Sequence, residues 1–327
     1  MSDRVFLRGM TSASYTLKGF REQQLQAPRV RGGNDVVVDD KSVGYGDIGG
    51  ATHNYWRVAP GDDPFLTQTL QVHFVELPPK SSNNGHGHQN EAAFYILEGR
   101  GYEIHDDKRY DWSKGDLVFV HTDSVHQHFN PYDEPAVALV TKAKSAWMYL
   151  GLVQQGSKSQ IDDPSRFGER IEWGQIWTKG VLNRKKVVHS DDSPWQDTPM
   201  GRKKVLSSPE KTDLRNFSVD VFELEIPAGG RSGRRWHMAD EILHVISGSG
   251  YSLHWEVGAD IAEKYYARVA NEPTRHDFAT GDTLYVPQNT VAQHFSSDGQ
   301  PLHMLSAQNR IFKMLGYDNV VYLDDVS

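Results

Sequence analysis

With 327 residues, 38% of them hydrophobic, the chain is long enough to bury two compact cores and too long for one small domain. Its formal net charge of −8 and the shortness of its basic runs argue against a nucleic-acid partner, because phosphate backbones are bound by clustered Lys and Arg side chains. The sequence contains no cysteine, so disulfide bonds, thiolate metal ligands and a cysteine nucleophile are excluded.

The first segment, residues 1–55, has no strong hydrophobic periodicity, and we interpret it as an arm that packs on the rest of the chain or on a neighbouring subunit. It lacks the apolar core of a secretory signal peptide. No apolar stretch of the chain approaches the ~20 residues that a membrane-spanning helix needs. We therefore expect a cytoplasmic protein without a membrane partner.

Residues 56–158 have the pattern of a small β-barrel. The runs 70–77 and 116–120 are short, rich in β-branched or aromatic residues, and bounded by turn residues. Gly99 and Gly101 mark a hairpin, since glycine tolerates positive φ angles. Many short strands separated by regular turns are typical of a sandwich or a closed barrel.

Three histidines in this region have the spacing of a metal site. His86 and His88 are two residues apart in a strand pattern, so both imidazoles point to one face of the strand. His126 begins a later strand, after the turn formed by Gly115 and Asp116. Three neutral imidazoles that converge from two hairpins leave coordination positions open on a metal, as metal-assisted chemistry requires.

His128 is the candidate catalytic residue beside this site. It lies two residues after His126 and therefore on the same face, and an ordinary histidine pKa of about 6.5 suits proton transfer. An equally good interpretation is a structural histidine of the barrel. Glu91, three residues after His88, is another candidate for such a role, but strand alternation puts it on the opposite face, where we expect a solvated or loop carboxylate.

Three residues are candidates for the lining of a substrate pocket. Phe94 and Ile96 share one face of their strand and are predicted to form an apolar wall that suits an aromatic or hydrophobic substrate. His73, on an earlier strand, is a further candidate, although an ordinary strand histidine is as good an interpretation.

Residues 159–215 are polar and rich in Trp, Asp and Pro, and we interpret them as a linker. Within it, Asp163 followed by Pro164 predicts a short helix with Asp163 as its N-cap. The linker is therefore expected to be partly helical.

Residues 216–327 repeat the pattern of residues 56–158 and predict a second barrel. The two copies agree at many fixed spacings, which identifies an internal duplication. The matched positions are Pro78 with Pro227, His86 with Arg235, His88 with His237, Gly99 with Gly248, Gly115 with Gly281, and His126 with Ala292.

These residues resemble the cupin superfamily over both copies, residues 70–151 and 219–316. The cupin signature joins a His-x-His pair and a Glu to a later His, with Gly or Pro at the turns between them. The first copy matches at His86, His88, Gly99, Gly115, His126 and Asn130, but has Ala92 for the Glu, and His121 and Asp123 for a Pro and a Gly. The second copy matches at Gly229, His237, Glu241, Gly248, Gly281 and Pro287, but has Arg235 and Ala292 for two of the histidines.

The resemblance implies an all-β chain of two tandem cupin (jelly-roll) barrels, with the metal ligands His86, His88 and His126 in the first barrel. Arg235 places a fixed positive charge where a metal would bind in the second barrel, which we predict to be free of metal. A bicupin with this ligand set resembles the gentisate 1,2-dioxygenase group, which includes salicylate and hydroxynaphthoate ring-cleaving enzymes and uses Fe(II) and O2. The resemblance therefore implies a non-haem iron dioxygenase that binds a small-molecule substrate and O2, and a homo-oligomer.

Two other classes of function stay open. Oxygen-independent cupin enzymes (isomerases, decarboxylases and lyases) use Mn, Zn, Ni or Fe, and a set of three imidazoles suits several of these metals. A ligand-binding bicupin without catalytic activity is the other alternative. A regulator of that kind would need an output module, and we find no helix-turn-helix or basic patch in the arm or the linker.

Overall fold

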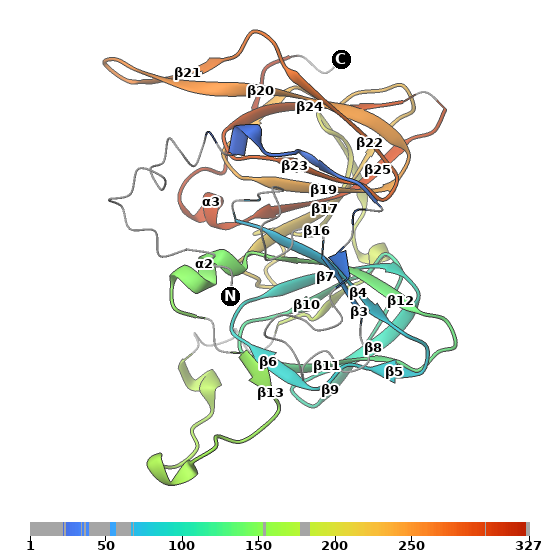
Figure 1. Ribbon diagram of the computed structural model, residues 1–327, viewed down its shortest axis with the longest axis vertical. Coiled ribbons are helices and arrows are strands. Elements are labelled where there is room, and N and C mark those ends of the chain that lie inside the picture. The colour runs from blue at the N-terminus through green and yellow to red at the C-terminus, as the bar shows by residue number, and fades with distance from the viewer. Residues whose placement is uncertain are drawn as a thin grey trace.

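The structure, a computed structural model, describes residues 22, 24–33, 35, 37–38, 53–56, 67, 69–152, 155–176, 184–297 and 299–324. Figure 1 shows two β-barrels stacked along the long axis of the molecule, with the second copy of the repeat above the first. Each barrel consists of an inner sheet, which faces the other barrel, and an outer sheet. None of the helices in the described part of the chain combines the length and the apolar character needed to span a membrane.

The first barrel closes around an inner sheet in the order β14-β10-β7-β12-β4-β3-β2 and an outer sheet in the order β13-β6-β11-β8-β9, with β5 beside β11. The inner strands are β2 (Val37–Val38), β3 (His53–Trp56), β4 (Gln71–Leu77), β7 (Ala92–Glu98), β10 (Leu117–Val120), β12 (Ala136–Lys142) and β14 (Val187–Val188). The outer strands are β5 (Ser81–Ser82), β6 (His86–His88), β8 (Arg100–His105), β9 (Lys108–Ser113), β11 (Ser124–Asn130) and β13 (Gln155–Ser157).

The second barrel has an inner sheet in the order β1-β23-β19-β25-β17-β16-β15 and an outer sheet in the order β21-β20-β24-β18-β26, with β22 beside β20. The inner strands are β1 (Val30–Arg31), β15 (Trp195–Thr198), β16 (Gly201–Ser207), β17 (Val219–Ile226), β19 (Glu241–Ser247), β23 (Thr283–Val286) and β25 (Leu302–Asn309). The outer strands are β18 (Arg235–His237), β20 (Ser249–Ile261), β21 (Tyr265–Val269), β22 (Thr274–Ala279), β24 (Thr290–Ser296) and β26 (Val321–Tyr322).

The central strands of the inner sheets are buried on both faces. Along β7, Phe94 and Ile96 enter the core inside the first barrel, whereas Tyr95 enters a separate core between the barrels. Ile242 and Tyr285 of the second barrel contribute to that same inter-barrel core. Because neither face of β10 or β23 meets water, these strands are nearly continuous apolar runs, whereas β15 and β16 at the end of their sheet carry exposed polar residues.

The described parts of the arm and linker belong to the sheets. β1 pairs with β23 of the second barrel, whereas β2 and β3 extend the inner sheet of the first barrel. Most of the predicted arm, residues 1–55, lies outside the described residues. Within the segment 159–215, β15 pairs with β16, and β16 pairs with β17, so the sheet of the second barrel begins before residue 216. β14, in the same segment, pairs with β10 of the first barrel.

The helices are short and lie between strands. They are α2 (Lys144–Tyr149), α3 (Ile311–Met314) and the 3-10 helices η2 (Pro164–Arg166), η3 (Trp173–Ile176) and η4 (Ser190–Asp192). The predicted N-cap is present, since the Asp163 side chain accepts a hydrogen bond of 3.2 Å from the Ser165 backbone N–H. The linker is thus partly helical, but its helices are single 3-10 turns.

Candidate metal centre

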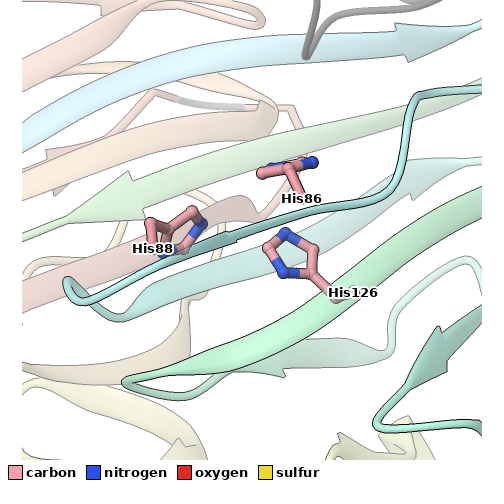
Figure 2. A group of neighbouring side chains, drawn as sticks. All are labelled: His86, His88 and His126. Carbon is pink, nitrogen blue, oxygen red and sulfur yellow. The ribbon is translucent and has the colours of Figure 1, made fainter. Parts of the chain in front are cut away.

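The strands β6 and β11 bring three histidines together. They are antiparallel neighbours in which His126 lies opposite His86, and Ser124 lies opposite His88. Figure 2 shows the three imidazoles grouped where these two strands run side by side. All three residues are buried, and one ring nitrogen from each lies within 4.8 Å of those from the other two.

The turn before β11 sets the position of His126. Asp123, which replaces the Gly of the cupin signature, has a φ of +58°, and Asn289 has a φ of +53° at the matching position of the second barrel. Asp and Asn adopt this left-handed conformation more readily than other residues with a side chain. The turn therefore keeps its geometry without glycine.

The backbone fixes the orientation of each imidazole. The Nδ1 atoms of His86, His88 and His126 lie 2.9, 2.5 and 3.2 Å from the carbonyl oxygens of residues Asn84, Asn90 and Ser124 respectively. A carbonyl only accepts hydrogen bonds, so each Nδ1 carries the proton and each Nε2 keeps its lone pair. A metal-binding histidine is held in this way by its other ring nitrogen.

Burial keeps the three imidazoles neutral. Removal from water lowers the pKa of His86 to about 4 and also lowers the pKa values of His88 and His126 well below their ordinary value. Neutral imidazole is the form that binds metals such as Fe, Zn and Ni. Nε2 of His126 is also buried without a hydrogen-bond partner among the described residues. The donor set, its protonation and this atom fit a divalent transition metal.

The corresponding place in the second barrel contains an ion pair. Arg235 is fully buried and its guanidinium contacts the carboxylate of Glu241, which also accepts a hydrogen bond from the Ser306 hydroxyl. His237 Nε2 lies 3.5 Å from the same carboxylate. The positive charge of Arg235 thus lies inside the second barrel, at the position that matches the metal centre. This charge would repel a metal cation there.

Comparison with known proteins agrees with this architecture. Residues 73–142 match the family model described as a cupin domain. The salicylate 1,2-dioxygenase of Pseudaminobacter salicylatoxidans superposes with a TM-score of 0.62 at 13% identity, over 96% of this chain and 98% of that one. The chain has a bicupin fold. No curated protein matches its sequence.

The likeness extends to proteins of different kinds. A variant of the salicylate 1,2-dioxygenase in complex with gentisate superposes with a TM-score of 0.60 at 13% identity, over 93% of this chain and 83% of that one. The vicilin of Solanum melongena superposes with a TM-score of 0.59 at 14% identity, over 93% and 89%. Since a dioxygenase and a vicilin are equally similar, these comparisons show the fold alone.

Beside the three histidines, this bicupin has a buried carboxylate that the sequence analysis did not identify. Glu103 lies opposite His128 in the pairing of β8 with β11, and its Oε2 is 3.0 Å from His128 Nδ1. Its Oε1 is 2.5 Å from His105 Nε2. Burial by itself would raise the pKa of Glu103, but the two histidines lower it to about 2. The ionised Glu103 therefore orients His128, whose Nε2 is buried without a hydrogen-bond partner among the described residues.

The predicted pocket residues face the inside of the first barrel. Phe94 and Ile96 line a cavity of about 20 Å³ together with His128, and the Phe94 and His128 rings are 4.7 Å apart. That space is sufficient for about one water molecule, whereas a ligand pocket has some 300 Å³ or more. Phe94 and Ile96 thus form an apolar floor under His128. His73 is buried on the same inward face of β4 as Val75.

Lys142 is a second residue that the sequence analysis missed. It is buried at the end of β12, on the face that Ala138 and Val140 direct into the barrel. After burial, its positive charge is the next cause of the lowered pKa of His73 and of His88. A buried cation therefore faces the region of the three histidines.

The expectation that Glu91 is a solvated or loop carboxylate was correct for its place in a loop and wrong for its exposure. Glu91 is fully buried, and its Oε2 accepts a hydrogen bond of 2.8 Å from the Phe217 backbone N–H. Strand alternation does direct this side chain away from the interior of the first barrel. That outer face is covered by the second barrel, however, so the carboxylate lies between the two barrels.

Proposed function

We propose that this bicupin is a non-haem Fe(II)-dependent dioxygenase that uses O2 to cleave a C–C bond of an aromatic or enediol-like substrate. Hydroxy-carboxylates of the gentisate, salicylate or hydroxynaphthoate type are the expected substrates. One observation supports the proposal most: three neutral histidines are anchored at Nδ1 by backbone carbonyls, with their Nε2 atoms available to a metal. The similarity to salicylate 1,2-dioxygenase structures agrees with it at the level of fold.

His86, His88 and His126 would hold the metal. The chemistry that bound Fe(II) supplies in such a site is the binding of two substrate oxygens and the reduction of O2. Three protein ligands leave positions for both reactants. Neutral ligands also leave the full charge of the metal uncompensated, so an anionic substrate is favoured electrostatically.

Other residues of the barrel would orient the substrate and its protons. His128 donates its Nδ1 proton to Glu103, which leaves Nε2 to accept a proton from, or return one to, a bound substrate. Lys142 provides a positive charge that attracts a substrate carboxylate. Phe94, Ile96 and Val118 keep water away from the base of the site.

Oxygen consumption tests the proposal. Protein loaded with Fe(II) under anaerobic conditions is mixed with O2 and one of a panel of substrates: gentisate, salicylates, hydroxynaphthoates, catechols and diketones. Oxygen uptake is expected with at least one hydroxy-carboxylate, and His88→Ala, checked for native folding, is expected to abolish it. Tight binding of another metal without oxygen uptake on any substrate would overturn the dioxygenase proposal and favour an oxygen-independent cupin enzyme. A cytoplasmic location and a homo-oligomeric state stay predictions from the sequence.

A further inference from the structure

Two buried carboxylates connect the barrels in a pseudo-symmetric way. Glu91 immediately precedes β7, and Asp240 immediately precedes β19 at the matching position of the repeat. Each carboxylate binds a backbone N–H from outside its own barrel. Glu91 accepts from Phe217 at 2.8 Å, just before β17, and Asp240 accepts from Thr69 at 3.0 Å, just before β4. We call these two contacts the inter-barrel latches.

The Phe217 end of the first latch is firmly held by the second barrel. The Arg310 guanidinium donates to the Asn216 carbonyl, and the Arg310 backbone N–H donates to the Ser218 carbonyl at 2.8 Å. Arg310 is itself buried in an ion pair with Asp220 of β17. Glu91 therefore binds a segment whose position is set by the second barrel.

The other end of this latch is adjacent to a histidine of the metal centre. His88 Nδ1 donates to the Asn90 carbonyl at 2.5 Å. That carbonyl belongs to the peptide group that ends at the Glu91 nitrogen, and a peptide group is planar and rigid. Displacement of Glu91 would therefore rotate the acceptor that fixes the orientation and tautomer of His88.

We propose that Glu91 is a positioning residue for the metal centre, through which the second barrel holds the Asn90 carbonyl against His88. The inference rests on the proposed metal site. It also gives the second barrel a role in the metal site of the first barrel, although the second barrel has Arg235 in its interior and is not expected to bind a metal itself. Asp240 makes the equivalent latch beside the Arg235–Glu241 pair, and neither it nor Thr69 is adjacent in the sequence to the three histidines, so it is a matched control.

Metal affinity measured on the full-length protein tests this role. Apo-protein is titrated with Co(II) in competition with a chelator, and the visible spectrum of bound Co(II) reports the ligand geometry. Loss of an outer-shell partner typically weakens a metal site about 10–100-fold. Glu91→Ala is expected to lower Co(II) affinity by that factor and to shift the spectrum. Glu91→Gln retains an oxygen for the Phe217 N–H and is expected to recover most of the affinity, whereas Asp240→Ala is expected to leave affinity and spectrum unchanged.

Separate readouts distinguish the possible failures. Co(II) affinity within about twofold of wild type in Glu91→Ala, or equal losses in Glu91→Ala and Asp240→Ala, would overturn the positioning role. If Glu91→Ala does not fold, Glu91→Asp, whose shorter side chain withdraws the carboxylate from Phe217, takes its place with the same expected loss. Absence of oxygen uptake in wild type bears on the proposed reaction alone, because Co(II) affinity does not depend on it. Absence of Co(II) binding in wild type would overturn the metal site and the latch role together.

Discussion

The two barrels share one scaffold and differ in the charges that they enclose. Three interior histidines of the first barrel, His88, His105 and His128, have counterparts in the second at His237, His254 and His294. Five other interior positions differ: His86 corresponds to Arg235, Ala92 to Glu241, Glu103 to Ser252, His126 to Ala292, and Lys142 to Gln308. The first two pairs place the buried Arg235–Glu241 ion pair in the second barrel, where the first barrel has a histidine of the metal centre and an alanine.

Each barrel contains a buried carboxylate that lies beside basic side chains of the same barrel. In the first barrel, Glu103 is paired with His105 and His128, below the three histidines of the metal centre. In the second, Glu241 is paired with Arg235 and hydrogen-bonded by Ser306. A fixed guanidinium supplies the cation of the second interior, whereas the first has three imidazoles at the corresponding place. On the proposals above, the first barrel binds the metal, and the second barrel positions part of that site through Glu91.

The largest expected effect comes from removal of the built-in cation. Arg235→Met leaves Glu241 buried without a counter-charge, which typically costs 3–5 kcal/mol of the free energy of unfolding. The double variant Arg235→Met, Glu241→Leu removes both charges and is expected to recover most of that loss. Urea unfolding measures both, and metal analysis is expected to give the wild-type metal content. A fall in metal content in the folded single variant would contradict the expectation that the Arg235–Glu241 pair does not affect the metal centre of the first barrel.

The second effect concerns the carboxylate of the first barrel. Glu103→Gln removes the charge that orients His128, and we expect kcat to fall about 10–100-fold, with little change in KM or metal content. His128→Ala and the double variant should show a similar loss, because residues that act as one unit are not additive. Ser252→Ala, at the matching position of the second barrel, is the control and should retain wild-type kcat. Fully additive losses would show that Glu103 does not act through His128.

The metal centre is more predictable from the sequence than its surroundings. His86, His88 and His126 follow from strand alternation, which is a local pattern, and from the internal repeat, which is found by comparing the two halves of the sequence. Glu103 was missed because a charged residue in an alternating strand ordinarily faces water, and its partner His128 belongs to a strand that is distant in the sequence. Glu91 was placed in solvent because the pattern of one strand does not reveal that a second barrel covers its outer face.

The strands within the segment 159–215, which we interpreted as a linker, escaped the sequence analysis for a related reason. β15 and β16 carry charged residues, Arg202 and Lys203 among them, and occupy one end of the inner sheet of the second barrel. Strands at a sheet edge tolerate such residues, so their composition resembles that of a loop. The pairing of β16 with β17, and of β15 with β16, identifies them as strands.

A smaller effect is expected at Lys142. The second barrel has Gln308 at this position, so Lys142→Gln gives the first barrel the residue of its counterpart. If Lys142 attracts the substrate carboxylate, the KM of a hydroxy-carboxylate should rise about tenfold, as loss of a charged hydrogen bond predicts. The KM of a catechol, which lacks the carboxylate, should be unchanged and is the control in steady-state oxygen uptake. Equal changes in both KM values would show that Lys142 has a structural effect only.

The smallest expected effect is the pH dependence that Asp240, the carboxylate of the second inter-barrel latch, gives to the free energy of unfolding. Burial raises the pKa of Asp240 from its usual 3.8 to about 6, although Thr69 and Tyr285 donate hydrogen bonds to it. The folded state therefore binds a proton over a range of pH in which the unfolded chain has lost it, so this group's contribution to stability decreases as pH rises from about 4 to about 6. Between pH 5 and 7 the decrease is about 1 kcal/mol. Asp240→Asn cannot ionise, so the difference in unfolding free energy between wild type and variant, measured in urea, should become less favourable to wild type across that interval. A difference that instead favours wild type more at pH 7 would mean that the latch works best with an ionised Asp240, held by Thr69 strongly enough to outweigh its burial.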